Sequence, residues 1–300
     1  MHKVENINKQ KALIIYFSGT GNTKGVAKAY ADSLESMGYS SALRSLEAYL
    51  ERQEDLASDL KDVDILAVGG PIYAGNVPDL LIHWLRTSLS KITGREAGAN
   101  KRIRALTFST SAVIDNAHGV HSLSAKLKKK GFAVVGEQAY VMPRNFYIDK
   151  YAATPLEEQR ALWSKMPEQV TSHLASVLGA GTAAQVQEQV QVQSNRPAMS
   201  ALGLIGIDLL ADVFRIMAKG MGKDYAASDA CTSCGLCVRQ CPKANITIAS
   251  SNTNSTANAK AASKATFGKQ CMLCTRCIHQ CPVNAISYKG KTIEQYRPQF

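Results

Sequence analysis

The first 230 residues of this 300-residue chain contain no cysteine, and all eight cysteines lie between Cys231 and Cys281. No apolar run is long enough to cross a bilayer. The residues from Met1 to Asn6 lack the apolar core of a secretory signal. Without an export signal, the close cysteine spacing is that of metal ligands and argues against a disulfide framework. We therefore expect a cytoplasmic protein with no transmembrane segment.

The N-terminal part of the chain alternates strand patterns with helical patterns. Strands are predicted at residues 12–17, 41–46, 64–70, 104–109 and 133–141, of which 41–46 is the weakest. Helices are predicted up to about Met37 and at residues 48–61, 78–90, 118–130 and 155–178. This alternation predicts an α/β fold with a doubly wound, five-stranded parallel sheet of order 2-1-3-4-5. In such a sheet, ligands bind at the carboxyl ends of the strands.

Composition divides the chain into three parts: an N-terminal domain at 1–181, a connecting region at 182–220 and a small C-terminal domain at 221–300. The alternating glutamines from Gln185 to Gln193 indicate a linker, although an edge strand is the alternative. Residues 199–217 have an amphipathic helical pattern. Such a helix would pack between the two domains or, alternatively, dock on a membrane surface or a partner.

The C-terminal domain repeats one cysteine pattern, C-x2-C-x2-C-x3-C-P, from Cys231 to Pro242 and again from Cys271 to Pro282. The two-residue gaps let three thiolates converge on one iron–sulfur cubane, while the fourth cysteine faces the other cluster. A zinc ribbon uses four cysteines in two pairs and has no role for a third cysteine at this spacing. The pattern therefore predicts two 4Fe–4S clusters.

Residues 225–290 resemble bacterial-type two-cluster ferredoxin domains, which implies a small α+β fold. The resemblance implies that each cluster takes three cysteines from one motif and the fourth from the other. The first cluster would be held by Cys231, Cys234, Cys237 and Cys281, and the second by Cys271, Cys274, Cys277 and Cys241. The polar insert at 250–263 is expected to be a solvated loop that leaves this ligation intact.

The loop after the first predicted strand has the composition of a phosphate site. Hydroxyls and successive backbone N–H groups at a helix N-terminus can hold a phosphate monoester without a cationic side chain. A dinucleotide fingerprint fails because Lys24 occupies its third glycine position, and a Walker loop fails because no Gly-Lys-[ST] ending follows. The candidate residues are Ser18, Gly19, Thr20, Gly21, Asn22 and Thr23.

Two later loops follow strands that end at the same edge of the predicted sheet. Tyr73 is expected either to stack on a bound ring or to cap the core. The candidate residues of the two loops are Pro71, Ile72, Tyr73, Ala74, Gly75, Asn76, Ser109, Thr110 and Ser111. Over residues 11–180 these loops and the phosphate loop resemble those of flavodoxins, which implies a flavodoxin-like fold that binds FMN. The whole chain is similar to the flavodoxin–ferredoxin fusion family of anaerobes.

This resemblance implies electron transfer between two 4Fe–4S clusters and a bound FMN. Because a cluster carries one electron and a flavin carries one or two, such a chain would convert between one- and two-electron redox partners. The alternative is a flavin-dependent reductase of a small molecule, such as a quinone or an oxygen species, fed by the clusters. Whether the chain is an enzyme therefore stays open.

The formal net charge of +11 bears on the choice of partner. Residues 221–300 hold ten Lys and Arg against three Asp and Glu, so +7 of this charge lies in the C-terminal domain. Anionic clusters and a flavin phosphate would take up part of it. No nucleic-acid motif accompanies the basic charge. We therefore expect acidic redox partner proteins and no nucleic acid.

Overall fold

The computed structural model of the chain describes residues 9–51, 55–88, 102–113, 117–146, 151–179, 212–214, 216–249 and 263–299. The predicted linker, most of the predicted helix at 199–217 and the polar insert at 250–262 lie outside these residues. Within the described part of the chain, no helix has the length and apolar character that spanning a membrane requires.

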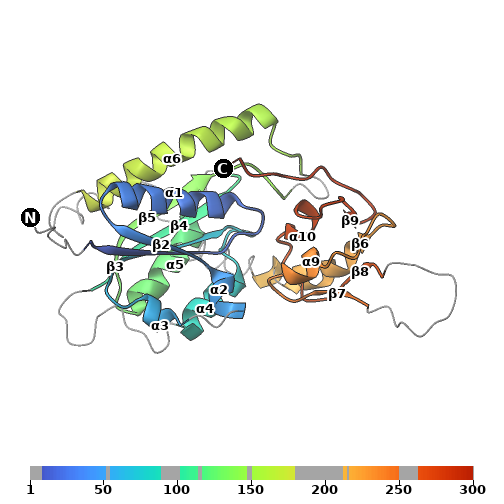
Figure 1. Cartoon of the computed structure of the whole chain (residues 1–300), viewed down its shortest axis with the longest axis horizontal. Helices are drawn as coiled ribbons and strands as arrows, with labels where there is room; N and C mark the ends of the chain where they lie inside the picture. Colours follow the sequence, from blue (N-terminus) through green and yellow to red (C-terminus); the bar gives the residue numbers. More distant parts are fainter. Residues whose placement is uncertain are drawn as a thin grey trace, which may run out of the picture.

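A five-stranded parallel sheet forms the centre of the N-terminal domain (Figure 1). Its order is β2-β1-β3-β4-β5, which confirms the predicted doubly wound flavodoxin-like topology. Strand β1 pairs on both sides, with Ile14 opposite Leu43 of β2 and Ala67 of β3. The strands are β1 (Lys11–Tyr16), β2 (Ser40–Ser45), β3 (Val63–Pro71), β4 (Arg104–Ser111) and β5 (Ala133–Val141).

Helices cover both faces of this sheet, as its uninterrupted apolar strands require. Figure 1 shows α1 and α6 on one face and α4 with α5 on the other. Ile14 belongs to the core under α1 and α6, whereas its neighbour Leu13 belongs to the opposite core, because successive strand residues point to opposite faces. The helices are α1 (Asn22–Ser36), α4 (Asp79–Ser88), α5 (Ala117–Lys129) and α6 (Leu156–Leu178).

The predicted single helix at 48–61 is wrong, because two short helices occupy this region. They are α2 (Leu46–Glu51) and α3 (Leu56–Asp59). Asp55 has an extended backbone, and its side chain accepts a hydrogen bond of 2.9 Å from the Ala57 N–H. This is an N-cap, so a new helix begins at Leu56.

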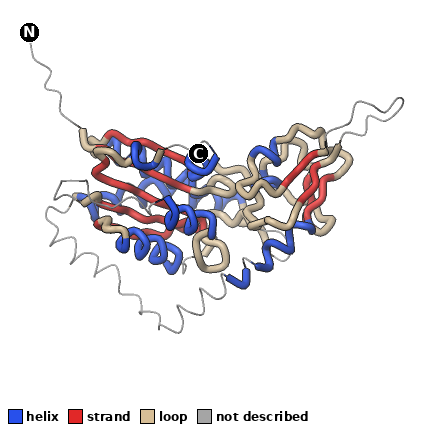
Figure 2. Tube along the Cα trace, turned by 90° about the horizontal axis from the view of Figure 1, so that it is seen from below, coloured by secondary structure: helices blue, strands red, loops and turns tan. Residues whose placement is uncertain are grey.

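The C-terminal domain consists of two short antiparallel pairs and two one-turn helices (Figure 2). Its elements are the 3-10 turn η1 (Gly222–Asp224), β6 (Tyr225–Ala227), α9 (Leu236–Arg239), β7 (Ile246–Ile248), β8 (Ala265–Phe267), α10 (Arg276–His279) and β9 (Ile286–Tyr288). Left-handed backbone positions recur forty residues apart, in the pairs Ser233 and Leu273, Gly235 and Thr275, and Ala244 and Asn284. The sequence repeat is therefore also a conformational repeat.

Residues 212–214 and 216–221 are helical and lie within the predicted amphipathic helix and just beyond it. Ala218 is buried in the C-terminal core, but Val213, Ile216 and Met217 are exposed. Val213, Ile216 and Met217 belong to the predicted apolar face, so none of the described residues of that face is buried.

Candidate functional site

The loop between β1 and α1 lies at the carboxyl end of β1, where a ligand site is expected. Gly21 has a φ of 117°, in the left-handed region that favours glycine. Its N–H donates to the Ser18 hydroxyl at 3.1 Å. Thr23 shares a 2.8 Å hydrogen bond with Thr110, which ties this loop to the loop that follows β4.

Backbone N–H groups in this loop are oriented to receive an anion. The carbonyl oxygens of Ser18 and Gly19 both accept hydrogen bonds from Arg276. In a trans peptide the N–H points opposite to the carbonyl, so the amides of Gly19 and Thr20 point away from that guanidinium. Among the described residues, neither amide donates to a protein acceptor. Free amides beside hydroxyls fit the phosphate of FMN.

The loop after β3 makes a tight turn. Tyr73 and Asn76 exchange backbone hydrogen bonds of 2.8 and 3.3 Å, and Ala74 and Gly75 between them both have positive φ. The Tyr73 side chain packs against the core under α4 and α5, and its hydroxyl would lie 2.5 Å from a Cβ on Gly19. Burial raises the pKa of Tyr73 well above 10. Tyr73 therefore packs against the phosphate loop at Gly19 as a neutral phenol.

The loop after β4 lies beside the other two. The Ile72 N–H, just past Pro71 at the end of β3, donates to the Thr110 carbonyl at 2.9 Å. Ser109 is fully buried, and its hydroxyl has no hydrogen-bond partner among the described residues. The Ser111 hydroxyl donates to the Val113 carbonyl. A buried hydroxyl without a partner is costly, so Ser109 is suited to a polar ligand atom.

The cysteines of the first predicted set surround one small cavity. Cys231, Cys234, Cys237 and Cys281 all line it. Cys234 is exposed, whereas Cys281 from the other motif is buried and accepts a 3.2 Å hydrogen bond from the Ala285 N–H. The fold thus brings the crossed fourth cysteine to the first three.

The cysteines of the second predicted set are electrostatic neighbours of one another. Burial, together with the thiolates of Cys274 and Cys241, raises the pKa of Cys271 to about 11. Burial also raises the pKa of Cys277 well above 9, with the same three cysteines adding to the effect. Such thiols need a cation to become thiolates, and cluster iron supplies that charge. The chemistry of both sets fits a 4Fe–4S cluster.

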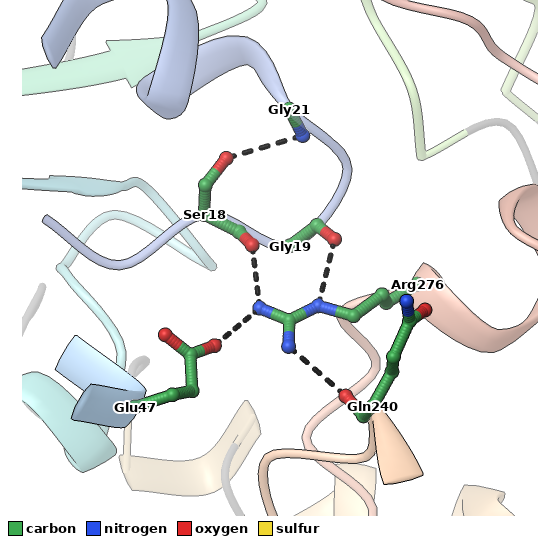
Figure 3. A network of polar contacts seen from close by, with 6 residues as sticks. All are labelled: Ser18, Gly19, Gly21, Glu47, Gln240 and Arg276. Atoms are coloured by element: carbon green, nitrogen blue, oxygen red, sulfur yellow. Dashed lines mark hydrogen bonds and ion pairs between the residues drawn. The ribbon is translucent and has the colours of Figure 1, made fainter. Parts of the chain in front are cut away.

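Arg276 joins the C-terminal domain to the phosphate loop (Figure 3). It donates to the carbonyls of Gly19 at 3.1 Å and Ser18 at 2.6 Å, and it forms an ion pair with Glu47 at 2.6 Å. Burial alone would lower the pKa of Arg276, but the negative groups around it, Glu47 first and then Cys274, together outweigh burial, and the pKa is raised. The ion pair is therefore charged and largely withdrawn from solvent, with side chains 12% and 15% exposed.

A second contact between the domains centres on Tyr296, in the segment that runs back from the C-terminal domain (Figure 1). The Tyr296 hydroxyl donates to Asn22 and accepts from Trp163 at 3.1 Å. The Tyr296 N–H donates to His279 Nδ1 at 3.0 Å, so His279 Nε2 carries the proton that it donates to the Asn145 carbonyl at 2.7 Å. Burial lowers the pKa of His279 to about 4, which agrees with this neutral tautomer.

The motifs did not reveal these inter-domain residues. The repeat contains one usable signal, because Leu236 in the first motif corresponds to Arg276 in the second. Likewise, His279 replaces Arg239. A departure from internal symmetry marks positions that the cluster fold itself does not dictate.

A cavity of about 710 Å³ also lies between the domains. It extends from Tyr73 and Asn76 to Lys129 in the last turn of α5, and Cys271 lies on its wall. Five cations and two carboxylates contribute to its lining: Arg86, Lys126, Lys129, Lys219, Lys243, Asp79 and Asp212. Its size is that of a small-molecule site, and its charge favours an anion.

Comparisons with known proteins identify both halves of the chain. The family model described as Flavodoxin matches residues 14–163, and the one described as a 4Fe-4S dicluster domain matches residues 230–285. No curated protein matches the chain.

Three solved structures are among those similar to this chain. A flavodoxin from the domain Archaea is 19% identical over 54% of this chain and 99% of its own, with a TM-score of 0.36. General stress protein 14 of Treponema denticola, in complex with FMN, is 18% identical over 56% of this chain and 98% of its own, with a TM-score of 0.39. Rubredoxin oxygen:oxidoreductase of the anaerobe Desulfovibrio gigas is 18% identical over 57% of this chain and 38% of its own, with a TM-score of 0.37.

Proposed function

The chain belongs to the flavodoxin family and carries a 4Fe–4S dicluster domain behind its flavodoxin domain, and from this premise we propose that it converts between one- and two-electron redox partners. Its cofactors are FMN and 4Fe–4S clusters, and it transfers electrons through flavin and iron–sulfur centres. When bound, FMN exchanges one or two electrons, and each cluster exchanges one.

We assign the FMN phosphate to the hydroxyls of Ser18, Thr20 and Thr23 and to the amides of Gly19 and Thr20. We assign the first cluster to Cys231, Cys234, Cys237 and Cys281, and the second to Cys271, Cys274, Cys277 and Cys241. The amide orientation in the phosphate loop and the gathering of each cysteine set support this assignment.

The two cysteine motifs differ in position, and this difference carries the proposal. A Cβ on Gly19 would lie 2.9 Å from the Cys274 carbonyl oxygen, so the second motif is in contact with the phosphate loop. Cys234 of the first motif is exposed. The second cluster is therefore the flavin-side cluster, and the first is the one that a partner protein can approach. The basic charge of this domain suits an acidic partner.

The second candidate function is reduction of a small molecule, and the inter-domain cavity favours it. Tyr73 of the loop after β3 and Cys271 of the second cysteine set both line the cavity. Its excess of cations would select an acceptor that bears a carboxylate or a sulfonate.

One experiment on protein purified without air separates the two functions. We expect about eight irons and about one FMN per chain, as two 4Fe–4S clusters and one flavin require. The reduced protein is then mixed in a stopped-flow instrument either with an acidic oxidised ferredoxin or with anthraquinone-2-sulfonate. Rapid oxidation by the ferredoxin, slowed by salt and by Cys234→Ser, supports the converter.

Rapid, saturable oxidation by the sulfonate alone, slowed by the double variant Lys129→Gln/Lys219→Gln, supports the reductase instead. The neighbouring pair Lys128→Gln/Lys130→Gln lies outside the cavity lining and is the control. Protein without iron and without FMN would contradict both functions.

A further inference from the structure

Arg276 breaks the symmetry of the repeated cysteine motif. It is the first residue of α10, between Cys274 and Cys277, and Leu236 is the first residue of α9 at the same place in the first motif. The two motifs otherwise share their left-handed backbone positions. Because a leucine suffices at this position in one motif, the cysteine loop itself does not require an arginine there.

The guanidinium uses its donors on both sides of the domain boundary (Figure 3). Two hydrogen bonds reach the phosphate loop, at the carbonyls of Ser18 and Gly19. One reaches Glu47, and one of 2.9 Å returns to the Gln240 carbonyl, which precedes Cys241. The planar fork of arginine makes this set of directed bonds, which the single ammonium of lysine does not reproduce.

These bonds fix the orientation of two peptides. With both carbonyls turned toward Arg276, the amides of Gly19 and Thr20 face the opposite side, as trans peptides require. Thr20 and Thr23, whose hydroxyls are assigned to the same phosphate, flank the first residue of α1. Such oriented amides form an anion nest, and a cation behind the carbonyls strengthens the same field.

We propose that Arg276 is a positioning residue shared by two cofactor sites, which holds the phosphate nest in its binding orientation while its backbone forms part of the second cysteine loop. This inference rests on the proposed FMN and cluster sites. Its consequence is a thermodynamic linkage: an intact second cluster loop raises the affinity for FMN, and bound FMN stabilises that loop by the same factor.

The linkage is tested by comparing FMN with riboflavin, which lacks the phosphate. The dissociation constant of each flavin is measured by fluorescence quenching in anaerobically purified protein. We expect Arg276→Gln to weaken FMN binding about tenfold, as loss of one charge-assisted contact set does. Arg276→Lys, which keeps the charge and loses the fork, should weaken it less. Riboflavin binding should stay unchanged in both variants.

Arg239→Gln is the matched control, because Arg239 is exposed and bonds only to the Cys234 carbonyl of its own motif among the described residues. Cys274→Ser should weaken FMN binding as Arg276→Gln does, whereas Cys234→Ser should not. Unchanged FMN affinity in both Arg276 variants would overturn the inference. An equal loss of FMN and riboflavin affinity would also overturn it, because that result indicates a general structural role. In either case the proposed function would stand as long as the protein retains FMN and iron.

Discussion

Gly19 is the residue at which three segments of the chain meet. A Cβ at this position would lie 2.5 Å from the Tyr73 hydroxyl and 2.9 Å from the Cys274 carbonyl oxygen. The second contact is with backbone, which cannot rotate away. Glycine is therefore required here by the close approach of the cysteine loop, in addition to any need of the phosphate.

Gly19→Ala should separate the phosphate loop from the second cysteine motif. We expect a loss of about 2 kcal/mol in the free energy of unfolding, typical of an overpacked contact, and weaker FMN binding. Chemical denaturation and FMN titration measure the two effects. Gly220→Ala is the control, because nothing lies within 4 Å of its Cβ. If Gly19→Ala behaved like this control, the prediction that the second cysteine loop packs tightly on the phosphate loop would be wrong.

At the scale of elements, α6 carries a buried histidine that the proposed function does not use. His173 is 5% exposed, and neither ring nitrogen has a hydrogen-bond partner among the described residues. Its ring lies 6.5 Å from the ring of Tyr30 on α1. Burial lowers the pKa of His173 from 6.5 to about 4, so the native protein holds this imidazole neutral.

This pKa shift predicts a dependence of stability on pH. Between pH 6.5 and 4 the unfolded chain binds the proton and the folded chain does not, so the free energy of unfolding falls as the pH falls through this window. Lowering the pKa from 6.5 to about 4 corresponds to no more than about 3 to 4 kcal/mol. His173→Leu should remove this part of the dependence. The measurement is the free energy of unfolding of the variant and of the wild type, from chemical denaturation at several values between pH 5 and 8. A stability difference between His173→Leu and the wild type that stays constant over this pH range would contradict the prediction.

At the scale of the whole molecule, local patterns predicted each half and missed the boundary between them. The apolar run of β1, the hydroxyls after it and the cysteine spacing are local features, so periodicity and motif reasoning found them. Arg276 and Glu47 are 229 residues apart in the chain, and Tyr296 and Asn22 are 274 apart. No periodicity links such positions. The split between α2 and α3 was missed for a different reason, because Asp55 acts as an N-cap inside an otherwise helical pattern.

The hydrogen bonds of Tyr296 join the C-terminal segment to the N-terminal domain, and the hydroxyl of Tyr296 can be removed by a single substitution. Tyr296→Phe leaves the Trp163 N–H and the Asn22 amide oxygen without this buried partner, which should cost about 2 kcal/mol. Because Asn22 lies in the phosphate loop and Tyr296 also bonds to His279 of α10, the variant should speed amide hydrogen exchange in both regions. Tyr151→Phe, at an exposed tyrosine, is the control. Faster exchange confined to the C-terminal segment would show that Tyr296 holds only its own segment in place. It would then not couple the phosphate loop to the second cysteine loop.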